Sequence, residues 1–256
     1  MNARDVLLHF ALKYDGNFDL MLSAIQKKER ITAEEIEDDR KKNDLDFIAI
    51  TDPKYPFGLK NIHKPPLILF YKGKIDLIKD FNKCVTIVGS REPTSYARKS
   101  VEKIAEELAK EGITIISGLA KGIDTSAALG ALKYGRAVAI LGNGVSYYYP
   151  SDNSSLQDEI GKNGLLLSEY PLALKPSKNN FVFRNRIMVG LSPFLLVGEA
   201  KDKSGTSTSV SYALENNRDI GCLPFRNEDD QCNNTLIQQG AALIKDASDV
   251  LAMLSN

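Results

Sequence analysis

Residues 84–144 read CVTIVGSREPTSYARKSVEKIAEELAKEGITIISGLAKGIDTSAALGALKYGRAVAILGNG, and this stretch decides the fold. In it, short β-rich apolar runs alternate with helix-length amphipathic segments, a pattern typical of βαβ units and a parallel sheet. Between the first two runs, an apolar stripe from Val101 to Leu108 has the i, i+3, i+4, i+7 spacing of a helix that packs on a sheet. Gly112 stands where a left-handed cap would end that helix.

The alternation continues to about residue 223 and predicts six strands. They are 85–89, 113–117, 137–141, 165–169, 194–199 and 219–223. Because these runs are apolar throughout rather than alternating, the sheet is expected to be covered by helices on both faces. The sequence therefore predicts an α/β fold with a mainly parallel sheet.

The part of the chain before this alternation has a different pattern. Residues 1–45 carry apolar side chains at spacings of three and four, as in Val6, Leu7 and Phe10, which predicts a small unit of short polar helices. The acidic run at 34–39 is most simply a solvated helix face, and a surface that docks a partner is the alternative reading.

Residues 46–82 contain two short extended pieces, FIAI and LILFY, separated by Pro-rich stretches. We interpret this segment as a linker or an extension made of edge strands. The predicted organisation is an N-terminal helical domain at 1–45, the linker or extension strands at 46–82, and the α/β domain at 83–256.

Composition indicates a globular protein with a packed core, since 43% of the residues are hydrophobic and the chain has 10 Phe and 10 Tyr. Its apolar runs fall short of the roughly 18 residues of a membrane helix, and Asp5 comes too early for a secretory signal, so we expect a soluble cytoplasmic protein. The 33 basic residues equal the 33 acidic ones. That balance argues against a uniformly basic nucleic-acid binder but leaves room for a local patch.

Several classes of chemistry find no support in the sequence. The three cysteines have no CxxC pair and the two histidines lie far from them, which disfavours a disulfide framework, a zinc site and a Ser-His-Asp or Cys-His enzyme. A GxGxxG stretch followed by an acidic residue is missing, as is a GxxxxGK[ST] loop, so NAD or ATP chemistry is not indicated. We expect no catalytic residue, no metal and no cofactor.

Gly, Ser and basic residues follow the predicted strands, at the edge where open parallel sheets bind their ligands. They are Ser90, Arg91 and Thr94 after the first strand, Ser117, Gly118 and Lys121 after the second, and the hydroxyl-rich stretch 203–208 after the fifth. One such turn is weak evidence, because Gly-Ser turns close many βα units for structural reasons. Their recurrence at one edge predicts a crevice for phosphate groups. The candidate charge partners are Arg91, Lys121, Arg184 and Arg186.

Three aromatic residues lie close in sequence to these basic turns: Tyr96, Phe181 and Phe183. Single-stranded nucleic-acid binders stack bases on such rings beside their phosphate contacts. Packing of the same rings in the core is an equally good reading, and the sequence leaves both open.

Seven blocks of the sequence resemble, in order and spacing, those of the DNA-processing protein A (DprA/Smf) family, over roughly residues 60–250. The blocks are VGSREPTSYA, SGLAKGIDTSAALGAL, ILGNGVSYYYPSDN, LLSEYP, FRNRIMVGLS, VGEAKDKSGTSTS and CNNTLIQQGA. The N-terminal helices with YPFGLKNIHKPPLILFYKG resemble the family's sterile-alpha-motif-like first domain more weakly.

The resemblance implies an extended Rossmann-like fold and a recombination mediator that binds single-stranded DNA without hydrolysing it. It further implies that a homodimer protects incoming DNA and loads the RecA recombinase onto it during natural transformation. By resemblance, the DNA-contacting pocket comprises Ser90, Arg91, Ser117, Gly118, Lys121, Arg184, Asn185, Arg186, Ser204 and Gly205. The dimer contacts would be Leu236, Ile237, Ala241 and Leu243. After Ile244 we expect a single helix and no C-terminal winged helix.

Two other readings remain. One is a phosphoribohydrolase of the related lysine-decarboxylase-like fold, which would cleave a nucleoside monophosphate with the PGGxGTxxE motif. The equivalent stretch here runs from Lys203 to Ser211 and has Ser in the carboxylate position, so the most plausible acid–base group is missing. The other is a nucleotide-sensing or protein-interaction scaffold that has lost DNA loading, which the family departures at Ala97 and Ala128 keep open.

Overall fold

The strands of the computed structural model form one nine-stranded sheet in the order β1-β2-β6-β5-β4-β3-β7-β8-β9, and the structure describes residues 2–201, 205–226, 228 and 232–255. The strands are β1 (Asp46–Ala49), β2 (Ile68–Gly73), β3 (Cys84–Val88), β4 (Thr114–Ser117), β5 (Ala137–Leu141), β6 (Leu165–Ser168), β7 (Phe194–Val197), β8 (Asp219–Cys222) and β9 (Ala242–Leu243). All six predicted strands are confirmed within one or two residues, as is the α/β fold.

Strands β3 to β9 all run parallel to one another. The chain builds the sheet outward from β3 through β4 and β5 to β6, then returns to place β7 on the other side of β3. The strand order therefore reverses between β3 and β7. In open α/β sheets such a reversal opens a crevice outside the carboxyl ends of the strands, where ligands bind.

Two antiparallel strands extend this sheet beyond β6. β2 pairs with β6, for example Phe70 with Ser168, and β1 pairs with β2. The segment at 46–82 thus supplies two strands of the same sheet, of which β1 is the edge, and this agrees with the extension reading of the sequence rather than with the linker reading. The domain boundaries at residues 45 and 82 stay predictions.

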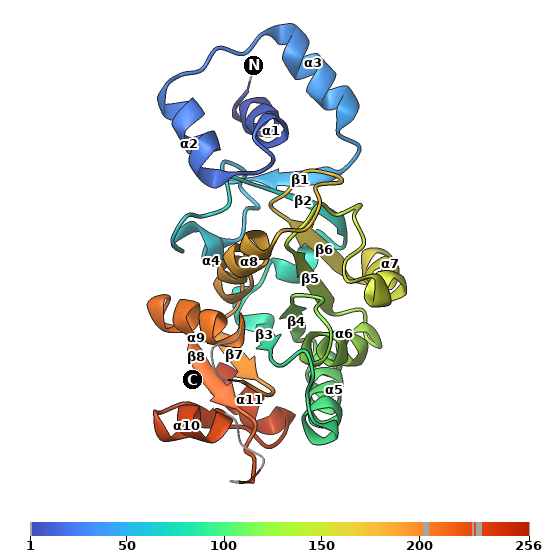
Figure 1. The fold of residues 1–256 in the computed structure, drawn as a ribbon, viewed down its shortest axis with the longest axis vertical. Helices are drawn as coiled ribbons and strands as arrows, with labels where there is room; N and C mark the ends of the chain where they lie inside the picture. Colours follow the sequence, from blue (N-terminus) through green and yellow to red (C-terminus); the bar gives the residue numbers. More distant parts are fainter. Residues whose placement is uncertain (1, 202–204, 227, 229–231, 256) are drawn as a thin grey trace.

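Helices cover both faces of the sheet, as the apolar strands predicted (Figure 1). The helices are α1 (Ala3–Lys13), α2 (Phe18–Gln26), α3 (Ala33–Lys42), α4 (Phe57–Lys60), α5 (Ser95–Lys110), α6 (Ile123–Leu132), α7 (Ser154–Asn163), α8 (Lys178–Gly190), α9 (Gly205–Glu215), α10 (Asn233–Gln238) and α11 (Ala247–Leu254), with short 3-10 turns η1 (Ile75–Ile78), η2 (Phe81–Lys83) and η3 (Ser151–Asn153). Side chains of α5, α6, α7 and α11 join one core cluster, and those of α4, α8 and α9 join the other. Gly112 has φ +83° directly after α5, so it is the expected left-handed cap.

The N-terminal helices α1 to α3 lie at one end of the elongated molecule (Figure 1). Side chains of Asn2, Asn17 and Thr32 cap them by accepting backbone N–H bonds. Leu8 and Phe10 pack in the same core cluster as Phe70 of β2, so the helical unit rests on the sheet extension. Within the described residues, none of the helices is both long and apolar enough to cross a bilayer.

Candidate nucleic-acid interface

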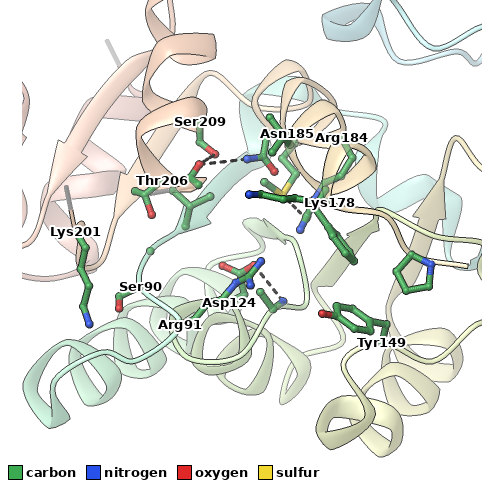
Figure 2. Close-up of a pocket in the computed structure, with 18 of the residues that line it drawn as sticks. Ser90, Arg91, Asp124, Tyr149, Lys178, Arg184, Asn185, Lys201, Thr206 and Ser209 are labelled. Carbon is green, nitrogen blue, oxygen red and sulfur yellow. Dashed lines mark hydrogen bonds between the residues drawn. The ribbon is translucent and has the colours of Figure 1, made fainter. Parts of the chain in front are cut away.

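A cleft of about 730 Å³ opens at the strand reversal between β3 and β7 (Figure 2). Its walls come from the loop after β3, the loop between β4 and α6, the first half of α8 and the start of α9. A smaller pocket of about 80 Å³ shares Arg91, Tyr149, Phe181 and Arg184 with the cleft and reaches Gly118 and Lys121. The parallel-sheet topology thus places a cleft at the edge of the sheet where the sequence predicted a ligand site, and binding of a ligand there stays a prediction.

Two exposed basic side chains line the cleft without a partner for their charge among the described residues. Arg91 follows β3 and Lys178 begins α8. Within the described part of the chain, neither side chain has an ion-pair or hydrogen-bond partner. Figure 2 shows Arg91 across the cleft from Lys178 and Arg184. The arrangement leaves positive charge facing an open space large enough for a ligand.

Arg184 is a third cation of the cleft, but it is only 5% exposed. Its Nη1 donates to the Ile140 carbonyl at 2.8 Å and lies 2.9 Å from the Met188 sulfur. Burial lowers the pKa of Arg184 to about 10, the Asp124 carboxylate opposes that shift, and the nearby Arg91 guanidinium adds to it. Two guanidinium groups that repel each other in one pocket form a site that an anion would stabilise.

Gly118 provides the room for this buried guanidinium. A Cβ atom at that position would overlap the Arg184 guanidinium, so any side chain would displace it. The backbone N–H of Gly118 donates to Asp124 Oδ2 at 3.1 Å, and that of Ala120 donates to the same oxygen at 3.2 Å. Burial raises the pKa of Asp124, while Arg184 and these N–H groups oppose the shift. Asp124 therefore fixes the loop after β4 on which the small pocket is built.

Of the three predicted hydroxyl residues Ser90, Thr94 and Ser117, the first lines the cleft and the other two make contacts within the protein. Ser90 lines the cleft, and its Oγ accepts from the Glu92 N–H at 3.1 Å. Thr94 instead caps α5, and both its N–H and its hydroxyl donate to Glu199 Oε2 at 2.8 Å. Ser117 is buried beside Asp124 under the loop.

The remaining predicted residues have diverse environments. Asn185 lines the cleft and donates from Nδ2 to the Gly205 carbonyl at 3.3 Å, and Gly205 itself lies on the cleft wall at the start of α9. Lys121 lines the smaller pocket, where its Nζ pairs with Asp152 at 2.5 Å. Ser204 lies outside the described residues.

The structure does not bring Arg186 to the cleft. Its side chain is fully buried, and Nη2 donates to both Glu169 oxygens at 2.6 and 2.7 Å. Nε donates to the Lys64 carbonyl, and the guanidinium lies 3.6 Å from the centre of the Phe183 ring. Arg186 is a structural residue here, because α8 turns its side chain away from Arg184 toward β6 and the segment before β2.

Aromatic side chains at the cleft come from two segments. Tyr149 and Phe181 stack with their ring centres 5.1 Å apart, and both line the cleft and the small pocket. Tyr149 is 41% exposed, so one edge of this pair faces solvent. Phe183 lies against Arg186, and Tyr96 packs edge-on against Phe225, which leaves Tyr149 and Phe181 as the aromatic pair of the cleft.

The profile of the family described as DNA recombination-mediator protein A matches residues 46–255. The chain belongs to this family. The DNA processing protein DprA of Streptococcus pneumoniae is 44% identical over 208 residues, which is 80% of this chain and 72% of that protein. Protein Smf of Synechocystis is 41% identical over 86% of this chain and 56% of its own length.

Solved structures of family members superimpose on the chain. DprA from Streptococcus pneumoniae matches with a TM-score of 0.77 at 34% identity, covering 98% of this chain and 93% of that one. DprA from Helicobacter pylori, whose structure is described in terms of its single-stranded DNA binding mode, matches with a TM-score of 0.75 at 30% identity, covering 82% and 96%. The expected family and its Rossmann-like fold are thus confirmed.

Sequence reasoning missed Lys178 and Tyr149 as cleft residues. Lys178 stands at the first position of α8 rather than at the end of a strand, where cations were expected. Tyr149 belongs to the block ILGNGVSYYYPSDN, in which three consecutive tyrosines hide which ring faces the cleft. Lys178 could have been found from the sequence, because it lies six residues before the predicted cation Arg184 and therefore nearly two turns away on the same helix.

Proposed function

We propose that the chain binds single-stranded DNA in this cleft as a recombination mediator. One observation carries the proposal: Arg91, Lys178 and Arg184, which have no carboxylate ion pair in the described part of the chain, meet the Tyr149–Phe181 pair at one opening. Guanidinium and ammonium groups bind phosphates, and exposed aromatic rings stack unpaired bases. The single-stranded DNA binding described for DprA from Helicobacter pylori supports the same class of ligand.

The depth of the cations favours a single strand over a duplex. Arg184 is 5% exposed, so a phosphate must enter the cleft to reach it. The phosphates of a duplex are held on a wide, stiff helix, whereas a single strand can bend one phosphate inward and turn a base onto a ring. We therefore expect the protein to prefer single strands.

The partners of the proposed function are a second copy of the chain and the RecA recombinase, in natural transformation in the cytoplasm. Leu243 supports the homodimer, since it is 47% exposed on β9, at the edge of the sheet. The other three predicted contacts, Leu236, Ile237 and Ala241, are partly buried against the core and precede Leu243 by two to seven residues in the chain. Leu243→Glu is expected to shift a dimer to monomer in light scattering.

We also propose that the chain is a binding protein rather than an enzyme. Asp124 is a buried carboxylate of the cleft, and its Oδ2 already accepts two backbone N–H bonds. The stretch that would carry the hydrolase Glu supplies Thr206 and Ser209 to the cleft instead. Release of free base from AMP by the purified protein would contradict this proposal and favour the phosphoribohydrolase.

The direct test is fluorescence anisotropy with an oligo-dT single strand and a duplex of equal length. We expect tighter binding to the single strand, and a roughly tenfold or greater loss in Arg91→Ala/Lys178→Ala. The matched control is Arg30→Ala/Lys110→Ala, which removes an Arg and a Lys outside the cleft. Equal affinity of the two double variants would overturn the proposed site, and no binding by the unmodified protein would overturn the function.

A further inference from the structure

The segment before β2 presents an exposed aromatic ring between two lysines. Tyr55, Leu59 and Ile62 are each at most 4% exposed and anchor the segment in the core, whereas Phe57 is 73% exposed. Lys54 and Lys60 are exposed three residues before and three residues after Phe57. Phe57 and Lys60 are the ends of α4, one helical turn apart, so they share a face of it.

The positive charge of this surface has no counter-charge within the described residues. Lys54 and Lys60 form no ion pair there, and the nearest carboxylate in sequence is engaged, since Asp52 pairs with Arg4. An exposed aromatic ring flanked by unpaired ammonium groups has the composition of a surface that binds an anionic, partly aromatic ligand, because single-stranded nucleic-acid sites combine phosphate contacts with stacking on such rings.

A third cation lies close to α4, in the turn after α9. The Arg218 guanidinium lies 4.7 Å from the centre of the Phe81 ring, and a Cβ atom at Gly58 would be 2.7 Å from that ring. Arg218 is partly buried, its Nε has no hydrogen-bond partner in the described chain, and burial lowers its pKa. We call Lys54, Phe57, Lys60 and Arg218 the α4 patch.

The α4 patch is joined to the cleft by α8. A side chain at Gly190, the last residue of α8, would collide with Leu59 and Ile62, so α4 and its flanks pack closely on that end. The first half of α8 carries Lys178, Phe181 and Arg184 of the cleft. Thirteen residues of helix span about 20 Å. Figure 1 shows α4, α8 and α9 along one side of the sheet.

We propose that the α4 patch is a second contact for the same DNA strand that occupies the cleft, with a base stacked on Phe57 and phosphates bound by Lys54, Lys60 and Arg218. This inference rests on the proposed function. The second half of α8, from Arg184 to Gly190, is buried, so a strand that leaves the cleft would pass over the elements that cover it and meet unpaired cations and an exposed ring again at the α4 patch. The patch therefore extends the binding site and favours longer strands.

The test compares two lengths of oligo-dT, about six and about thirty nucleotides, by fluorescence anisotropy with the full chain. Phe57→Ala/Lys60→Gln is expected to weaken binding of the long strand by roughly tenfold, because a stacked base and a phosphate contact are both lost. Binding of the short strand, which the cleft alone can hold, is expected to stay unchanged. The matched control is Tyr134→Ala/Lys110→Gln, with a 46% exposed ring and an exposed lysine of the α5–α6 side.

The outcomes separate this inference from the proposed function. Unchanged long-strand affinity, or the same loss for both lengths, would overturn the α4 patch while leaving the cleft in place. A change of oligomeric state in light scattering would also overturn it, because the patch would then be a contact between proteins. A wild-type chain that binds neither strand would overturn the cleft and the patch together.

Discussion

The N-terminal helical unit and the cleft use charge in opposite ways. In the helical unit, Arg40 donates to both oxygens of Asp5 at 2.9 Å, and Lys13 pairs with Glu29 at 2.6 Å. In the cleft, Arg91 and Lys178 have no partner within the described residues. Paired charges hold elements of the protein together, whereas charges left open at a cleft are available to a ligand.

The same contrast occurs within α8, between two arginines that stand two residues apart. Arg186 is enclosed by Glu169, the Lys64 carbonyl and Phe183. Arg184 has a carbonyl and a sulfur as hydrogen-bond partners, and its Nε has none in the described chain. Sequence alone treats the two as equivalent, and only the direction of each side chain from the helix shows that Arg186 is enclosed while Arg184 lines the cleft.

The largest expected effect is a difference in stability between two single variants, in which Arg186 or Arg184 is replaced by Met. Arg186→Met leaves the Glu169 carboxylate buried without its partner, so we expect a loss of about 3–5 kcal/mol in the free energy of unfolding. Arg184→Met should cost about 1 kcal/mol, because Asp124 keeps its two backbone N–H bonds. Urea denaturation of both variants measures this difference, and equal losses would contradict the division between the two arginines.

The same Arg184→Met variant is expected to lose affinity for single-stranded DNA. A buried guanidinium contact to a phosphate is worth more than an exposed one, so a loss of ten- to a hundredfold is expected, from roughly 1.5–3 kcal/mol for a charged hydrogen bond. Anisotropy with oligo-dT measures it. Affinity retained within twofold would show that Arg184 supports the cleft without touching the strand.

A smaller effect is expected in the helical unit, where a charge pair can be tested by pH. Burial alone would raise the pKa of Asp5, but hydrogen bonds from Arg40 and the Asn2 backbone outweigh it and hold the pKa below the ordinary value of an aspartate. A lowered carboxyl pKa contributes stability above the ordinary value, and that contribution disappears as pH falls through the folded value. Asp5→Asn should cost about 0.5–1 kcal/mol at neutral pH. The difference in the free energy of unfolding between Asp5→Asn and the unmodified chain, measured by urea denaturation, should disappear in acid. A difference that does not change with pH would contradict a lowered pKa for Asp5.

The smallest effect concerns the ion pair at the mouth of the small pocket. Lys121 pairs with Asp152, and this contact lowers the pKa of Asp152. Because a phosphate must compete with this carboxylate, Asp152→Asn should raise affinity for single-stranded DNA roughly two- to threefold at low salt. Asp158→Asn, on the nearby α7, is the control. If Asp152→Asn instead binds single-stranded DNA more weakly than the unmodified chain, the Lys121–Asp152 pair shapes the pocket rather than competing with the DNA.

Much of the fold was predictable because it depends on local patterns. The strands contain continuous apolar runs at 137–141 and 165–167, and Gly112 caps α5 as its position after the apolar stripe indicated. The sequence allowed extension strands at 46–82, but it did not show that β2 pairs with β6. Antiparallel pairing between residues about a hundred positions apart leaves no local signal in the sequence.

The candidate site was predictable at the strand ends and less so on the helices. Ser90, Arg91 and Gly118 follow strands whose carboxyl ends meet at one edge, so topology places them at the cleft or the adjoining pocket. Thr94 and Arg186 carry the right chemistry but face Glu199 and Glu169. Those partners lie 105 and 17 residues away in the chain, and such pairings follow from packing rather than from spacing.

The salt dependence of single-stranded DNA binding tests the central claim most directly. If Arg91 and Lys178 bind phosphates, the unmodified chain should lose affinity as salt rises, and Arg91→Ala/Lys178→Ala should have a log–log slope shallower by roughly 0.7 for each cation removed. The Arg30→Ala/Lys110→Ala control should keep the original slope. Parallel slopes for all three proteins would contradict the claim that open charges in the cleft hold the strand.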